Sequence, residues 1–396
     1  MEWLGVAIFV VALLVSVGLH EIGHLVTAKA FGMKATRYFI GMGPTIWSTN
    51  RGETEYGVKA FPIGGFVKII GMTSMDEVDP EDEPRSFRRA PGWQRAIVLA
   101  AGSFMHFLLA TVLLFGLAVF LGVENDNTTQ LGSISACVPA SAQAANTGAP
   151  CTTKDAKSPA AAAGLRPGDK ITSFDGRSVS TYDQLAADIK DVKPGVTVPV
   201  TVQRDGHPVT LHATITSVKG RSGGFLGITG APVYQSVSPL GALDFVGSGW
   251  SQTVTGDVGA IASLPSEIPK LFNKQDASSG SGVTSMVGIA EVTGQVVAQP
   301  VGWQPKADFI IQIIAMINIF VGLFNLLPVL PMDGGHILAV FLERIRAVIA
   351  RKRHRPDPGL FDLQKLIPVS FSIFAVIVVF SVAVLISNIV NPVNIG

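Results

Sequence analysis

The sequence predicts an α-helical membrane protein with four transmembrane helices, a membrane-associated β-loop on the cytoplasmic side and an extracytoplasmic α+β domain. Of the 396 residues, 48% are hydrophobic and only 15% are charged, whereas a soluble domain carries about 25% charged residues. Four almost uncharged stretches each reach the roughly 20 residues that a helix needs to span a bilayer. A longer, more polar segment separates the second stretch from the third.

The four stretches set the predicted boundaries of the spans. They lie within residues 1–30, 93–123, 309–332 and 366–390. The first is not typical of a cleavable signal peptide, because it is long and has Glu2 where a basic region should stand.

The distribution of lysine and arginine predicts the orientation of the chain. Residues 29–95 hold ten of them, residues 333–365 hold seven, and the much longer segment 124–308 holds thirteen. Cytoplasmic loops carry the excess of positive charge. The first connection and the basic loop 333–365 are therefore expected in the cytoplasm and both termini outside it, which predicts a plasma-membrane protein. The net charge of +1 gives no general attraction to nucleic acid, so no such partner is expected.

Residues 31–92 are predicted to form the β-loop and a charged linker. The run Gly64-Gly65-Phe66-Val67-Lys68-Ile69 mixes glycine with β-branched and aromatic residues, as short strands with tight turns do. The run is apolar for a cytoplasmic loop, so we expect it to dip into the membrane face. A small cytosolic β-hairpin is the alternative.

The extracytoplasmic domain is predicted at residues 124–220. It contains a helical run at 182–189 and two strands joined by Asp205-Gly206, which is a strong hairpin signal. Residues 221–308 follow as a membrane-proximal segment of helical patches and Gly/Ser loops.

The sequence His20-Glu21-Ile22-Gly23-His24 lies near the end of the first apolar stretch. Residues four apart share one face of a helix, so the two histidines can bind one metal ion. Two imidazoles suit zinc, and Glu21 suits a general base acting on a water beside the metal. Ionisable residues inside a membrane are costly and usually functional. The pattern therefore favours a zinc hydrolase site over a structural histidine pair.

Asp333 is the best candidate for a third zinc ligand. A catalytic zinc ion takes three protein ligands and keeps one open position. Asp333 closes the third apolar stretch, and both this stretch and the first are expected to reach the cytoplasmic side there, so His20, His24 and Asp333 should share one depth near the inner leaflet. Pro328 and Pro331 break the helix just before it, which a membrane tolerates only against protein or a water-lined cavity.

These motifs resemble those of bacterial site-2 proteases, which are intramembrane zinc metalloproteases with a PDZ domain that control sigma factors. The run from His20 to His24 matches the family's HExxH motif, and the spacing of Asn325, Pro328 and Asp333 matches its second signature. The resemblance implies a Zn²⁺ cofactor and a role for Asn325 in contacting the substrate. It also implies that the partners are single-pass membrane proteins such as anti-sigma factors, already trimmed by an upstream site-1 protease.

Two further blocks carry the resemblance. The run at residues 165–169, Leu-Arg-Pro-Gly-Asp, matches the PDZ signature, so the extracytoplasmic domain is expected to be a PDZ domain. Ala101-Gly102 matches a block in the second helix, after which the family usually has Asn where this chain has His106. We expect His106 to make interhelical hydrogen bonds. A contact behind the metal ligands or to the transition state is the alternative.

Cys137 and Cys151 flank a polar stretch that is inserted after the first predicted PDZ strand. They fall outside the membrane, where disulfides persist, so a bridge across the insertion is predicted. Two free thiols are the alternative.

The substrate of such a site has to be held as an extended peptide. A transmembrane helix must unwind before its peptide bonds can be attacked, and unpaired amides in lipid are costly. The strand edge at Gly64, Gly65, Phe66 and Val67 is predicted to pair them by strand addition, opposite the Asn325–Pro328 segment. The alternative from another class is a catalytically silent scaffold or a zinc-binding transporter, neither of which needs Glu21 as a base.

Overall fold

The structure is a computed structural model that describes residues 2–72, 76–125, 127–141, 151, 155–231, 233–267, 286–299, 301–356 and 358–390. The chain divides into two compact units. The helical unit contains residues Met1–Leu117 and Pro239–Ile395, and the sheet unit contains Ala118–Ser238.

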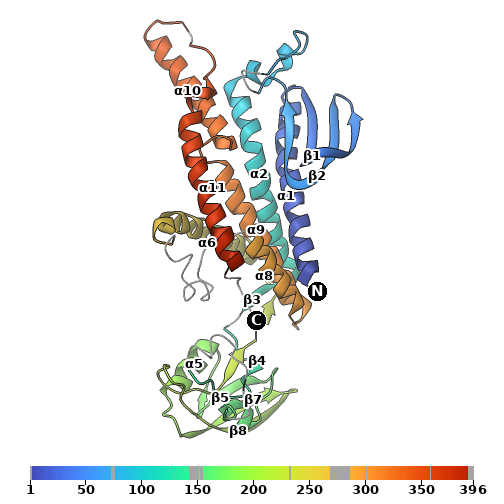
Figure 1. Ribbon diagram of the computed structural model, residues 1–396. Coiled ribbons are helices and arrows are strands. Elements are labelled where there is room, and N and C mark those ends of the chain that lie inside the picture. The colour runs from blue at the N-terminus through green and yellow to red at the C-terminus, as the bar shows by residue number, and fades with distance from the viewer. Residues whose placement is uncertain are drawn as a thin grey trace. The chain divides into compact units, whose positions relative to one another are not determined.

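Four helices of the helical unit are long and apolar enough to cross a membrane. They are α1 (Glu2–Ala30), α2 (Gly92–Gly116, continued by a π-helical turn at Leu117–Leu121), α9 (Trp303–Asn325) and α11 (Ile367–Val390). They run alongside one another in Figure 1. The prediction of a helical membrane protein with four candidate spans is confirmed.

The third span ends earlier than the sequence predicted. It was expected to reach residue 332, but α9 ends at Asn325 and a short turn leads into α10 (Asp333–Lys352). Pro328 and Pro331 lie in this turn, where their missing amide hydrogens and fixed φ end the helix. The prediction of a loop at 333–365 is wrong for its first 20 residues, which form the helix α10.

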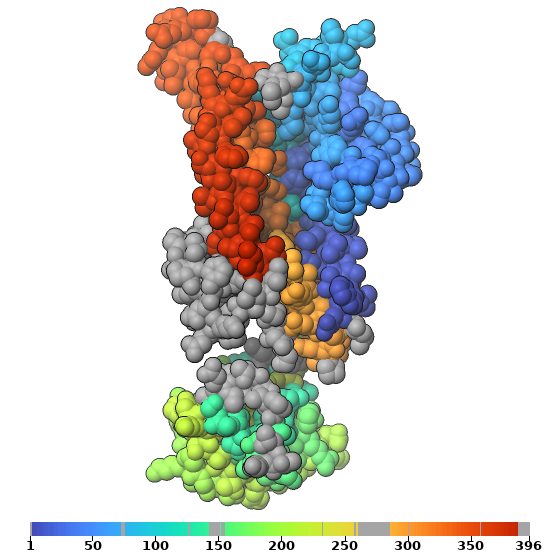
Figure 2. Space-filling view, in the orientation of Figure 1, coloured from blue at the N-terminus to red at the C-terminus, as the bar shows by residue number. Residues whose placement is uncertain are grey.

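The β-loop forms a curved sheet beside α1, built from β1 (Ala35–Arg51) and β2 (Thr54–Ile69). Residues 35–40 of β1 pair with residues 65–69 of β2, and residues 37–40 also pair with 55–58. Among the described residues no further strand pairs with the outer side of 65–69, which is an edge. The Tyr38 hydroxyl donates to the Gly18 carbonyl of α1, 2.9 Å away, and fastens the sheet to the helix. Figure 2 shows the sheet as a blue lobe projecting from the helices.

Two short 3₁₀ helices follow in the charged linker, η1 (Glu83–Arg85) and η2 (Phe87–Arg89). The segment predicted as membrane-proximal contains α6 (Pro239–Glu267) and α8 (Met286–Ala298). Helix α6 packs on α2 and α9 through Val246. Helix α8 lies against α1, where Gly5 faces the backbone of Gly294 so closely that a side chain would not fit.

The sheet unit is an α+β domain. A four-stranded sheet has the order β6 (Arg177–Ser178), β5 (Lys170–Phe174), β7 (Thr197–Arg204) and β8 (His207–Thr214). Helices α4 (Pro159–Ala163) and α5 (Tyr182–Asp191) pack around it. Asp205 and Gly206 both have positive φ, as the predicted hairpin turn requires.

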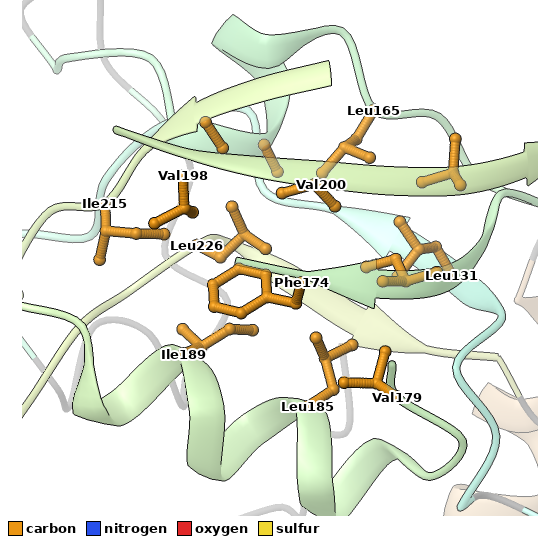
Figure 3. Close-up of a cluster of buried hydrophobic side chains, with 14 residues drawn as sticks. Leu131, Leu165, Phe174, Val179, Leu185, Ile189, Val198, Val200, Ile215 and Leu226 are labelled. Atoms are coloured by element: carbon orange, nitrogen blue, oxygen red, sulfur yellow. The ribbon is translucent and has the colours of Figure 1, made fainter. Parts of the chain in front are cut away.

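Two small strand pairs complete the sheet unit. They are β3 (Val123–Asn125) with β10 (Val233–Gln235), and β4 (Leu131–Ile134) with β9 (Ile228–Gly230). The unit therefore extends beyond the predicted limit of 220. The sequence did not predict β9 and β10 because three residues are too few to show an alternating pattern. Its apolar core includes Phe174, Leu185 and Leu226 (Figure 3). A disulfide joins Cys137 and Cys151, whose Cα atoms lie 5.9 Å apart.

Candidate metal centre

Three ligand atoms meet between α1 and the start of α10. The Nε2 atoms of His20 and His24 lie 3.1 Å apart, and each is 3.4 Å from Oδ2 of Asp333. The two histidines are 9% and 6% exposed. Among the described residues this is the one group of three or more His, Cys, Asp or Glu side chains whose geometry could hold a metal ion.

The spacing fits a tetrahedral zinc ion. Zinc bonds of about 2.0–2.1 Å in a tetrahedron separate the ligand atoms by roughly 3.3–3.4 Å, close to the three observed distances. Asp333 Oδ2 is buried without a hydrogen-bond partner in the protein, although unpaired buried oxygens are costly. Two imidazole nitrogens and a carboxylate oxygen form the donor set of a catalytic zinc site with one position open.

The backbone of α2 shapes this site. The Val98 carbonyl lies 2.7 Å from Nδ1 of His24. A carbonyl only accepts, so Nδ1 carries the hydrogen and Nε2 has the lone pair that a metal needs. A Cβ at Gly102 would lie 2.5 Å from His24 Nε2 and 2.7 Å from His20 Nδ1. Glycine there leaves the room in which the two imidazoles face Asp333.

Asp333 is held by the fold of its own neighbourhood. It is the first residue of α10. The turn that precedes it packs closely against the two residues that follow it, Gly334 and Gly335. A Cβ at Gly334 would collide with the Leu326 carbonyl, and one at Gly335 would come within 2.7 Å of the Leu330 nitrogen. This close approach explains the two glycines after the aspartate.

Helix α10 is itself fixed to α2. Glu343 forms a buried ion pair with Arg95 and accepts a hydrogen bond from the Phe361 amide, 2.9 Å away. Because α10 carries Asp333 at its first turn, these contacts hold the carboxylate beside the histidines of α1.

Glu21 faces the edge strand of the β-loop. A Cβ at Gly65 would lie 3.2 Å from the Glu21 side chain, and the Val67 backbone amide interacts with the Glu21 carboxylate. The predicted base therefore lies between the metal ligands of α1 and strand residues 65–69. Gly65 and Val67 are predicted substrate-binding residues, and their position beside Glu21 could not be predicted from the sequence.

The remaining predicted residues are Asn325, Pro328 and His106. Asn325 is the last residue of α9, and Pro328 is exposed in the turn that leads to Asp333. His106 is bonded to Ser16 and Asn318, as an interhelical histidine would be. Ser16 and Asn318 were missed, although a polar residue inside an apolar stretch is itself a signal.

Comparisons with known proteins identify the family of this chain. The model of peptidase family M50 matches residues 8–356. The chain belongs to peptidase family M50. It is 34% identical to zinc metalloprotease Rip1 of Mycobacterium tuberculosis strain H37Rv, over 98% of each chain. It is 33% identical to zinc metalloprotease Rip1 of Mycolicibacterium smegmatis, over 99% of this chain and 98% of that one.

Family membership makes the chain a metalloprotease of the site-2 type. One solved structure, a PDZ domain of the SdrC-like protein of Listeria monocytogenes, aligns with 28% of this chain and 93% of its own at 22% identity, with a TM-score of 0.19. That score is too low to carry an argument about the sheet unit.

Proposed function

We propose that this M50 metalloprotease cleaves transmembrane helices of single-pass proteins, with His20, His24 and Asp333 as its zinc ligands. The observation that carries the proposal is the place of these side chains. His20 and His24 lie in a helix that is long and apolar enough to span a bilayer, and Asp333 follows a second such helix after a short turn. A site there meets peptide bonds that are themselves in the membrane.

Glu21 is the proposed general base. Bound zinc would supply a Lewis acid that polarises the scissile carbonyl and acidifies water. The Glu21 carboxylate takes the proton of the attacking water and then donates it to the leaving amine. The Val67 amide and the packing of Gly65 orient this carboxylate.

The unwound substrate is held by the edge of β2. Residues 65–69 are paired with β1 on one side, and Gly65 and the Val67 amide lie beside Glu21 of α1. A peptide added as the next strand would satisfy its amides in a low-dielectric surrounding and would lie beside the base. Asn325 and Pro328, in the segment that leads to Asp333, are proposed to contact the substrate from the other side.

The proposed setting is the plasma membrane, with both termini outside the cytoplasm and the site near the cytoplasmic face. The Lys and Arg distribution supports this orientation. Anti-sigma factors trimmed by an upstream site-1 protease are the proposed substrates, as suits a relative of the Rip1 metalloproteases. Cleavage would release a cytoplasmic fragment together with its sigma factor.

The sheet unit is proposed to be a PDZ domain that restricts substrates by the size of their extracytoplasmic part. A cavity of about 350 Å³ lies between α5 and residues 221–228. PDZ domains bind peptides by strand addition. Here the Ile228 carbonyl already accepts from the Tyr182 hydroxyl, 3.0 Å away, and the Gly224 amide donates to the Lys190 carbonyl, 3.1 Å away. These backbone groups are already bonded within the unit and so are not free to pair with an added peptide strand. This favours the size restriction over ligand capture.

Cleavage of a model transmembrane substrate by the purified full chain tests the proposal. Wild type should cut and Glu21→Gln should not, with zinc content equal in the two. A Glu21→Gln variant that cuts at the wild-type rate would remove the base from the mechanism. Zinc binding by wild type with no cleavage would favour the silent scaffold or transporter.

A further inference from the structure

A buried polar cluster lies one helical turn from the metal ligands. It joins three helices through Ser16 of α1, His106 of α2 and Asn318 of α9, which are 4%, 3% and 1% exposed. Ser16 is four residues before His20, and His106 is four residues after Gly102, so the cluster stacks directly on the metal group. The ring centroids of His106 and His20 are 4.9 Å apart.

The hydrogen bonds of the cluster fix each proton. Asn318 Nδ2 donates to the Ile314 carbonyl, 2.8 Å away, and this sets which way the amide faces. Its Oδ1 then accepts from the Ser16 hydroxyl and from His106 Nδ1, at 2.5 and 2.9 Å. His106 Nδ1 therefore carries a hydrogen, and the ring is held from two helices.

The two histidine ligands are supported differently. His24 is oriented by its bond to the Val98 carbonyl. His20 Nδ1 is buried beside the Gly102 backbone but makes no hydrogen bond of good geometry there. The His20 ring instead packs against His24, at a centroid distance of 4.7 Å and 85°, and against His106, at 4.9 Å and 41°.

We propose that His106 is a positioning residue for the zinc ligand His20, and that Ser16 and Asn318 anchor it. The inference rests on the proposed metal site. Metal-binding histidines are normally oriented by a hydrogen bond from the second ring nitrogen, and loss of such support costs about 10–100-fold in metal affinity. At His20 the ring of His106, which is held by Ser16 of α1 and Asn318 of α9, takes the place of that bond. Removing this contact lets the His20 imidazole turn away from the metal.

The test is the rate at which the zinc-loaded full chain, in detergent, loses zinc to a chelator. His106→Ala and Asn318→Leu should each speed this loss about tenfold or more. Ser16→Ala, which removes one hydroxyl and is the mildest change, should speed it less but measurably. Thr111→Val is the matched control, because Thr111 also lies on α2 and accepts an interhelical bond from Trp250, 3.2 Å away, outside the cluster.

A cluster that only holds helices together predicts another result. All four variants would then lose some thermal stability and release zinc at the wild-type rate, which would overturn the inference. If His106→Ala and Asn318→Leu do not fold, a wild-type rate in Ser16→Ala overturns it alone, and a faster rate in Ser16→Ala than in Thr111→Val supports it. Failure of wild type to bind zinc would refute the metal site itself, which distinguishes the two proposals.

Discussion

The helical unit and the sheet unit bury different kinds of side chain. Around the metal group, imidazoles, a carboxylate, an amide and a hydroxyl are packed between α1, α2, α9 and α10, and Asp333 Oδ2 makes no hydrogen bond. In the sheet unit the buried cluster is apolar, and the buried carboxylate of Asp169 is paired with Arg204. Unpaired polar atoms in a membrane reduce stability, so the buried atoms His20 Nδ1 and Asp333 Oδ2, which both lack a hydrogen bond, mark where the helical unit serves chemistry.

The comparison leads to an expectation for each region. Substitutions near the metal group should change metal binding or cleavage with modest effects on folding. Substitutions in the sheet unit should change its stability and leave zinc in place.

Gly102→Ala is expected to have the largest effect. Its Cβ would lie 2.5 Å from His24 Nε2, so the imidazoles must move and zinc affinity should fall at least about tenfold, with loss of cleavage. Gly247→Ala, on α6 with nothing within 4 Å of the added Cβ, is the control and should behave as wild type. Normal zinc content in Gly102→Ala would show that the α2 backbone does not shape the site.

Phe174→Ala should have the opposite signature. The ring is fully buried in the core of the sheet unit, and its removal should lower the stability of that unit by about 3–5 kcal/mol. Hydrogen exchange of β5 and β7 in the full chain would report the loss, and zinc content should stay at the wild-type value. A matching loss of zinc would mean that the two regions are not separate in the way described.

The Asp169–Arg204 pair gives a smaller, pH-dependent effect. Burial raises the pKa of the Asp169 carboxyl, but hydrogen bonds from Arg204 and from the Arg166 amide outweigh it and hold the pKa below its usual value. A lowered folded pKa adds stability above the unfolded pKa of about 3.9, and this stability is lost as the pH falls through the folded value. Asp169→Asn should therefore cost about 1–3 kcal/mol at pH 7 and less at pH 2. Equal costs at both values would show that the charge is not what stabilises the pair.

Strand addition at β2 predicts the smallest effect. In a peptide substrate, esters can replace backbone amides one at a time across the cleavage site. Each amide that pairs with residues 65–69 contributes about 0.5–1.5 kcal/mol, so alternate positions should each lose roughly two- to tenfold in cleavage efficiency. A flat profile, with no period of two, would mean that the substrate is not held as a strand.

Much of this arrangement could be predicted from local sequence. The helical spacing of His20 and His24 fixes their common face, and the prolines before Asp333 mark the end of a helix. The packing around them could not be predicted. The need for glycine at 102 arises from the crossing of α1 and α2, and the pairing of Ser16 with Asn318 joins residues 302 apart in sequence. Such contacts depend on tertiary structure, for which a single sequence has no periodic signal.

The most direct measurement is the zinc content and cleavage rate of Asp333→Ala beside Glu21→Gln, in the purified full chain. With only two histidines left, Asp333→Ala should lose zinc and activity together. Glu21→Gln should keep a full complement of zinc and lose activity by about 10²–10⁴-fold. Full zinc and full cleavage in Asp333→Ala would contradict the account, because the three side chains would then not form the metal centre.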